Sequence, residues 1–307
     1  MTNKELLEKC FRSASNSRKL SNSSIEKYTS SIRRFFSVIG EKDFQDISIE
    51  DFEEYNFRAG KIGAKDARIA NVISAVKWAL AKMQSMRLIE ATINLKDIEK
   101  PKIIRKEVVY LDEKEIFEFI DCIRSEVGNK PSIKNVRFLT LIMFLLQTGA
   151  RIGEVLSISH ADINLQRGEV GIIGKGRKER TLFLQDETMD LIRKYLAMRI
   201  DEHEALFVSL SGKSRWQQTD VGRSFRRFKN LSGISKKFTL HTLRHTFATQ
   251  YLSKHVPLNT VQFLLGHSTP MTTLKFYVGA VEKDNAKKVI MDEHFNFIPK
   301  TAVKSEK

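Results

Sequence analysis

One cationic side chain stands directly after the most apolar part of the chain, where it could act on an anion. In the segment TGARIGE, residues 148–154, Arg151 follows an apolar run from Phe138 to Leu146. A guanidinium beside a core is costly unless it has an anionic partner. That partner is either a bound anion or Glu154, three residues further on, in a structural ion pair.

A second segment, HTLRHTFATQYL at residues 241–252, brings two histidines and an arginine onto one predicted helix. His241 and Arg244 are three residues apart and share a face. His241 and His245 also have the i, i+4 spacing of a zinc helix, but Thr242 stands where metalloproteases need glutamate. Because the charge of Arg244 would repel a cation, we expect no metal at these histidines. We expect no other cofactor either.

Two further segments supply a lysine, a histidine and a tyrosine. Lys175 lies between glycines in GKGRKER, residues 174–180, and no glycine precedes it at the distance that a nucleotide-binding P-loop requires. His267 and Tyr277 belong to LLGHSTPMTTLKFY, residues 264–277. Taken alone, the lysine is more typical of a hairpin tip that contacts DNA than of a catalytic site, and the tyrosine is more typical of a core or surface aromatic than of a nucleophile.

Together these residue types fit one reaction, the transesterification of a phosphodiester without a metal. Arginine forks can bind the charged non-bridging oxygens bidentately. A tyrosine supplies an oxygen nucleophile whose aryl ester keeps the bond energy for rejoining. A lysine can protonate the leaving 5′-oxygen as general acid, and histidines can bind the phosphate or transfer protons near neutral pH.

The four segments closely resemble the motifs of the tyrosine recombinase family, which includes the phage integrases and the Xer recombinases. TGARIGE, GKGRKER, HTLRHTFAT and LLGHS followed by a tyrosine occur in the family's order and spacing, and the resemblance covers roughly residues 110–290. It implies a catalytic set with the following members: Arg151, Lys175, His241, Arg244, His267 and Tyr277.

Three members of this set would hold the phosphate. The resemblance implies that Arg151 and Arg244 clamp the scissile phosphate and that His267 donates a hydrogen bond to it. Glu154 matches a common acidic position of the family, which would buttress the site without taking part in the chemistry.

The other three members would transfer protons and attack. Lys175 would be the general acid for the leaving 5′-hydroxyl, while His241 would assist the deprotonation of Tyr277 and later its release. Tyr277 would form the 3′-phosphotyrosyl link. Tyr277 follows His267 by ten positions, where many Xer-like members have nine, and it is the only tyrosine after Tyr251.

The implied activity is that of a site-specific DNA recombinase, which exchanges strands through a Holliday junction for integration, excision or chromosome-dimer resolution. The implied assembly is a homotetramer on two double-stranded DNA sites, with or without a partner recombinase or accessory protein. A type IB topoisomerase would use similar chemistry as a monomer without a defined site. A DNA-binding regulator on the same fold would bind without cutting and would have no need of a nucleophile.

The charge balance also favours a polyanionic partner. The chain has 307 residues, a net charge of +15 and a pI near 9.7. Residues 1–107 contain 21 basic and 15 acidic residues, which leaves 31 and 22 for the rest, so both halves are basic. A lysine-rich proteome is the alternative explanation. The segment before His241 holds four candidate DNA contacts, whose alternative is a solvated helix face: Arg223, Arg226, Arg227 and Lys229.

Other features predict a cytoplasmic protein that does not enter a membrane. Cys10 and Cys122 lie far apart without metal-ligand spacing, as expected of reduced thiols. The N-terminus MTNKELLEKC carries charges where a signal peptide needs an apolar stretch. The longest apolar run is far shorter than the roughly 20 residues of a membrane span.

The elements that must position these residues are predicted to be mainly helical. Ser23 with Glu26, and Ser48 with Asp51, have capping-box spacing, and Gly60 is expected to end the second helix. A third helix shows one apolar face: Ile69, Val72, Val76, Leu80 and Met83. Residues 168–184 predict a β-hairpin.

The predicted fold class is mainly α, with an N-terminal helical, SAM-like core-binding bundle and a C-terminal α+β catalytic domain that contains a small β-hairpin or sheet. The expected limits are 1–100 for the DNA-binding bundle, 101–109 for a linker around Pro101, and 110–297 for the catalytic domain. The last part of that domain would pack onto a neighbouring subunit, and residues 298–307 would form a disordered tail.

Overall fold

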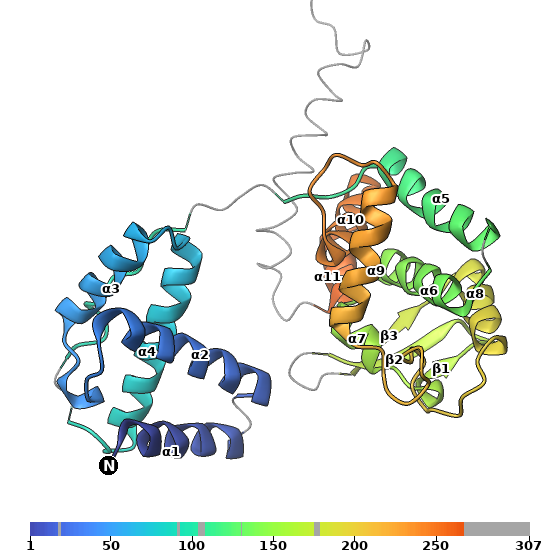
Figure 1. Cartoon of the computed structure of the whole chain (residues 1–307). Coiled ribbons are helices and arrows are strands. Elements are labelled where there is room, and N and C mark those ends of the chain that lie inside the picture. Colours follow the sequence, from blue (N-terminus) through green and yellow to red (C-terminus); the bar gives the residue numbers. More distant parts are fainter. Residues whose placement is uncertain (18–19, 91–92, 104–107, 130, 175–178, 267–307) are drawn as a thin grey trace, which may run out of the picture. The chain divides into compact units, whose positions relative to one another are not determined.

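The computed structural model describes residues 1–17, 20–90, 93–103, 108–129, 131–174 and 179–266. Contacts divide the chain into two compact units, Met1–Lys106 and Glu107–Lys307. Both are mainly helical, and the described part of the chain contains one small antiparallel sheet (Figure 1). The predicted fold class is confirmed. The domain limits and roles expected from the sequence stay predictions.

The first unit is a bundle of the helices α1 (Asn3–Asn16), α2 (Asn22–Ile39), α3 (Ile49–Lys61) and α4 (Asp66–Ser85). The predicted apolar face of α4 is buried throughout. Its aromatic neighbours in the core come from α2, α3 and the short 3-10 helix η1 (Phe44–Asp46): Phe35, Phe36, Phe44, Phe52 and Tyr55. Burial of these faces is the main driving force for a bundle of this size.

Two predicted helix ends in this unit are shifted. The cap of α2 is Ser21, whose Oγ accepts a hydrogen bond from the Ser24 amide at 3.3 Å, so the capping box predicted at Ser23 is wrong. Gly60 lies inside α3, which ends at Lys61. The capping box of Ser48 with Asp51 is confirmed. Ser21, Ser23 and Ser24 stand close together where α2 begins, and local sequence does not distinguish them as caps.

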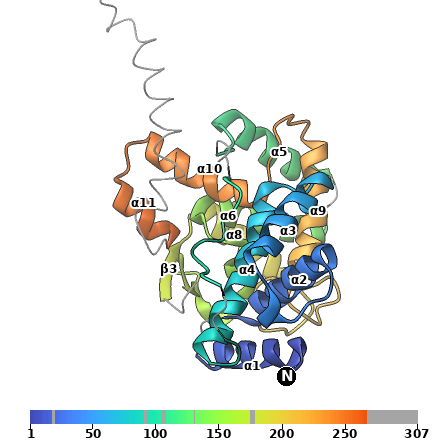
Figure 2. The same cartoon turned by 90° about the vertical axis from the view of Figure 1, so that its left-hand side faces the viewer.

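The second unit is built around α6 (Ile133–Thr148), most of whose side chains are buried. Figures 1 and 2 show α6 inside the unit, and α5 (Glu113–Asn129), α8 (Asp186–Ala197) and α10 (Leu240–Ser253) pack against it. The remaining helices are α7 (Ile152–Ser157), α9 (Gln218–Leu231), α11 (Leu258–Leu265) and the 3-10 helix η2 (His160–Asp162). The apolar run 138–146 is therefore a core helix, as expected.

The sheet has the strand order β1 (Ile163–Asn164), β2 (Glu169–Ile173) and β3 (Glu179–Phe183), all antiparallel. The predicted hairpin is β2–β3, with Val170 opposite Leu182 and Ile172 opposite Arg180. Val170, Ile172 and Leu182 are buried against the helices. The two-residue strand β1 was not predicted, because so short a strand leaves no alternation to detect.

Two glycines end the helices that lead into the motif segments. Gly149 after α6 and Gly266 after α11 both have the left-handed conformation, with φ of +60° and +62°. Glycine tolerates this conformation without steric cost. These two ends fix where the chain leaves α6 toward Arg151 and where α11 stops.

In the part of the chain that the structure describes, no helix is both long and apolar enough to cross a membrane. Cys10 is buried and Cys122 is half-buried, and both are free thiols.

Candidate active site

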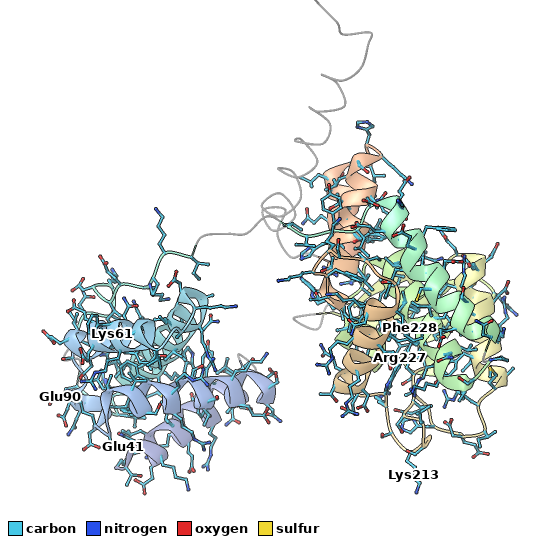
Figure 3. All side chains as sticks on the ribbon, turned by 45° about the horizontal axis from the view of Figure 1, so that its top comes forward. Glu41, Lys61, Glu90, Lys213, Arg227 and Phe228 are labelled. Atoms are coloured by element: carbon cyan, nitrogen blue, oxygen red, sulfur yellow. The ribbon has the colours of Figure 1, made fainter. Side chains whose placement is uncertain are left out.

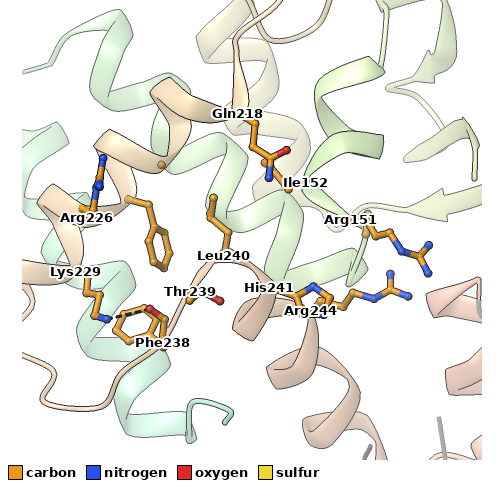
Figure 4. A pocket seen from close by; sticks show the side chains of 13 residues that line it. Arg151, Ile152, Gln218, Arg226, Lys229, Phe238, Thr239, Leu240, His241 and Arg244 are labelled. Atoms are coloured by element: carbon orange, nitrogen blue, oxygen red, sulfur yellow. Dashed lines mark hydrogen bonds between the residues drawn. The ribbon is translucent and has the colours of Figure 1, made fainter. Parts of the chain in front are cut away.

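A cavity of about 650 Å³ lies between α9, the N-terminal part of α10 and the start of α7 (Figure 4). Its described lining includes four cationic side chains and one imidazole: Arg151, Arg226, Lys229, Arg244 and His241. No aspartate or glutamate is among the residues described as lining it. A cavity lined by cations favours an anion. Figure 4 shows Arg151 and Arg244 at one end, with Arg226 and Lys229 at the other.

Arg244 is held from behind by two helix ends. Its side chain is buried, Nη1 donates to the Gly149 carbonyl at 2.7 Å and Nη2 donates to the Leu265 carbonyl at 2.7 Å. These carbonyls terminate α6 and α11, where the helix dipole is negative. The guanidinium thereby joins α10 to two other helices, and its position does not depend on a ligand.

Arg151 is the N-cap residue of α7 and remains partly exposed toward the cavity, with 35% of its side chain accessible. Its Nη1 lies 2.8 Å from Glu154 Oε1, and its backbone amide donates to Glu154 Oε2 at 2.9 Å. The structural ion pair considered from the sequence is therefore present. It uses one side of the guanidinium, and Arg151 still lines the cavity.

Glu154 also contacts a residue that sequence analysis missed. Arg180 on β3 is largely buried, and its Nη2 lies 2.9 Å from Glu154 Oε2. Burial by itself would raise the pKa of Glu154, but the hydrogen bonds from Arg151 and the charge of Arg180 lower it overall. The carboxylate stays ionised between two guanidiniums. A signal for Arg180 existed, because strand alternation places this charged residue on the same inward face as Leu182.

His241 lies in the first turn of α10, which a capping box of Thr239 and Thr242 fixes. Desolvation lowers the pKa of His241, and the charges of Arg244 and Arg151 lower it further. The imidazole is therefore neutral at neutral pH and can accept a proton.

The His241 ring lies edge-on to His245 with the centroids 4.5 Å apart. Desolvation, His241 and Arg244 together lower the pKa of His245 to about 4. The charge of Arg244, which adds to the effect of desolvation on both pKa values, would also oppose a cation between the two rings.

The four candidate DNA contacts on α9 separate into different environments. Arg226 lines the cavity, and no acidic side chain among the described residues pairs with it. Arg223 is exposed and lies 2.9 Å from Asp220. Arg227 pairs with Glu126 on α5, and its guanidinium lies 4.7 Å from the centroid of the Phe228 ring (Figure 3).

Lys229, the fourth candidate, has a structural contact. Its Nζ donates to the Phe238 carbonyl at 3.0 Å, which Figure 4 marks with a dashed line. This bond ties α9 to the loop that leads into Thr239 and the start of α10. Lys229 therefore supports the position of His241 as well as contributing charge to the cavity.

Three members of the predicted catalytic set, Lys175, His267 and Tyr277, lie outside the described residues. The other three, Arg151, His241 and Arg244, line one cavity although α7 and α10 are far apart in the sequence. The segments 282–297 and 298–307 also lie outside the described residues.

Known proteins match large parts of this chain. A tyrosine recombinase of Thermosipho africanus is 28% identical over 278 residues, which cover 88% of this chain and 94% of that protein. The tyrosine recombinase XerD of Staphylococcus saprophyticus is 32% identical over 182 residues, covering 57% of this chain and 60% of the relative.

Solved structures share the fold. The XerH recombinase bound to a palindromic difH substrate has a TM-score of 0.71 and 22% identity, with coverage of 93% of this chain and 85% of that chain. A lambda integrase dimer bound to a core site has a TM-score of 0.68 and 19% identity, with coverage of 89% and 97%. The model of the phage integrase family matches residues 110–283. This match spans more than half of the sequence, and the chain belongs to the phage integrase family of tyrosine recombinases.

Proposed function

We propose that this chain is a site-specific DNA recombinase that cleaves and rejoins strands through a 3′-phosphotyrosyl intermediate at Tyr277, without a metal. One observation carries the proposal: the cavity that holds Arg151, His241 and Arg244 has four cations and no acidic residue in its described lining. A phosphodiester in transfer carries negative charge on its non-bridging oxygens, and this lining matches that charge.

The two arginines are suited to different parts of this task. Arg244 is fixed by the Gly149 and Leu265 carbonyls before any substrate binds, so no reorganisation is needed when charge develops. Arg151 is more exposed and can fork onto a second oxygen. The arginines would thus supply the charge that a metal ion supplies in other phosphoryl-transfer sites.

In the proposed reaction the Tyr277 oxygen attacks phosphorus, the bond from phosphorus to the 5′-oxygen breaks, and Lys175 protonates the leaving 5′-oxygen. His241, neutral because its pKa is lowered, accepts the tyrosine proton. His267 hydrogen-bonds the phosphate. In rejoining, a 5′-hydroxyl attacks the phosphotyrosine, Lys175 takes up its proton, and Tyr277 leaves with the proton from His241.

The proposed partner is double-stranded DNA, bound by a homotetramer on two sites. The names of the solved relatives support the DNA partner, since XerH is bound to a difH substrate and the lambda integrase dimer to a core site. Residues 1–100 would bind the core site and residues 110–297 would carry the chemistry, with the segment after Tyr277 packing on a neighbouring subunit. The proposal covers both mobile-element integration and chromosome-dimer resolution.

A nicked suicide substrate tests the nucleophile. The binding site would first be selected from a random duplex library, and the wild-type chain and Tyr277→Phe would then be incubated with it in EDTA. We expect a denaturation-resistant protein–DNA adduct from the wild-type chain and none from the variant, which lacks the phenolic oxygen. Tight, specific binding without any adduct would favour a non-cleaving regulator. Relaxation of supercoiled DNA without a defined site would favour a type IB topoisomerase.

Arg226 and Arg227 form a matched pair for testing DNA contact. Arg226→Gln should weaken DNA binding. The plot of log binding constant against log salt concentration should become less steep by about 0.9, the value for one lost phosphate contact. Arg227→Gln should change the slope less, because Arg227 is already paired with Glu126. Equal slopes for both variants, measured by fluorescence anisotropy between low and moderate salt, would contradict the assignment of Arg226.

A further inference from the structure

Arg180 is a cation placed where a strand normally points an apolar side chain into the core. It stands opposite Ile172 in the hairpin, and only 9% of its side chain is accessible. Burying a guanidinium is costly, and burial lowers its pKa even though Glu154 opposes this. Its Nε is buried without a hydrogen-bond partner among the described residues. An apolar residue would avoid these costs, which points to a role for the charge itself.

The guanidinium of Arg180 contacts two elements of the site at once. Through Nη2 it binds Glu154 on α7 at 2.9 Å. It also packs directly against Gly266 at the end of α11, where any side-chain carbon would collide with it. The glycine is therefore required by its left-handed φ of +62° and by the neighbouring arginine.

The bond to Glu154 reaches Arg151. Glu154 Oε2 accepts from Arg180 and from the Arg151 amide, which leaves Oε1 to accept from Arg151 Nη1 at 2.8 Å. With one carboxylate oxygen held in this way, the plane of the carboxylate and hence the direction of the Arg151 fork are fixed. A carboxylate without Arg180 could rotate and bind both sides of the Arg151 fork, which would compete with a phosphate.

We propose that Arg180 is a positioning residue, which orients Arg151 toward the scissile phosphate through Glu154 and sets the end of α11 against the hairpin. In sequence, the same residue follows Lys175 by five positions and its contact Gly266 precedes His267. One buried cation thus links the elements that lead to three members of the predicted catalytic set. This inference rests on the proposed function.

The test compares Arg180→Lys with Arg199→Lys in the full chain. Arg199 is a matched control, since it is 3% accessible, pairs with Asp201 and donates to the Ala205 carbonyl at 2.7 Å. Most of its contacts lie in the loop after α8, it also contacts His160 in η2, and it is not among the residues described as lining the cavity. At saturating DNA, we expect Arg180→Lys to form the suicide-substrate adduct about 100-fold more slowly, the scale of a misplacement near 1 Å. Arg199→Lys should form the adduct at the wild-type rate, although its thermal stability should fall by about as much as that of Arg180→Lys.

A second readout separates positioning from general damage. On a substrate with a neutral methylphosphonate at the scissile position, Arg151 has less charge to bind, so the defect of Arg180→Lys should shrink. In a double-mutant cycle, the effects of Glu154→Gln and Arg180→Lys on the rate of adduct formation should be clearly non-additive. A wild-type rate in Arg180→Lys, or an equal defect on both substrates, would overturn the inference. No adduct from the wild-type chain would instead overturn the proposed function, and this inference with it.

Discussion

Replacing Arg244 with lysine should lower the rate of covalent adduct formation by about 10³-fold, the upper range for loss of one preorganised donor to a transition-state oxyanion. The guanidinium has enough donors to bind the Gly149 and Leu265 carbonyls and still face the cavity. An ammonium group is a compact point charge and cannot do all three at once. Net charge is kept, so DNA binding should change little.

The same substitution should lower the free energy of unfolding by about 2 kcal/mol, because a buried carbonyl at the end of α6 or α11 is left without a donor. Adduct formation would be measured in single turnover at saturating DNA, and unfolding by urea titration. Arg226→Lys is the control: Arg226 lines the same cavity from α9, and no hydrogen bond from it is found among the described residues. If Arg244→Lys formed the adduct as fast as this control, the proposal that the Arg244 guanidinium stabilises the transition state would be wrong.

Replacing Gly149 with alanine should lower the free energy of unfolding by about 3 kcal/mol. The left-handed φ of +60° costs a residue with a side chain about 1–2 kcal/mol. The new carbon would also lie 2.5 Å from Phe247 Cδ1 and 3.0 Å from Leu265 Cδ2. Relieving such overpacking typically costs about 1–3 kcal/mol. Because the Gly149 carbonyl accepts from Arg244, adduct formation should fall as well.

Gly128→Ala provides the matched control for this substitution. Gly128 lies in the last turn of α5, and a side-chain carbon there would meet no atom within 4 Å. Alanine is favoured over glycine by roughly 0.5–1 kcal/mol in a helix interior and by less in the last turn, so this variant should be at least as stable as the wild-type chain. Urea titrations followed by circular dichroism would compare the three proteins. Similar destabilisation by both alanines would show that neither the backbone conformation nor the contact with Phe247 matters.

Local sequence predicted the types of the main elements, some of their ends and the residues that could carry the chemistry. Apolar periodicity predicted α4, and a continuous apolar run indicated the buried α6, which ends at Gly149 as α11 ends at Gly266. Two short β-prone runs on either side of a glycine-containing basic turn predicted the β2–β3 hairpin. These features depend on residues within a few positions of one another, so they leave a local signal. Where several neighbouring residues can cap a helix, as with the serines at the start of α2, local sequence did not identify Ser21 as the cap.

Tertiary structure alone decided the partners that charged residues have far away in the sequence. Arg244 reaches carbonyls 95 and 21 positions away, Arg180 reaches Glu154 over 26 positions, and Arg227 reaches Glu126 over 101. Local sequence made the four basic residues of α9 equivalent, whereas packing against α5 and α10 gave each a different environment. A hydrogen bond or ion pair forms only between groups that the whole fold brings within about 3 Å. The residue types therefore fixed what chemistry was available, and the packing of distant helices fixed which cations face the cavity.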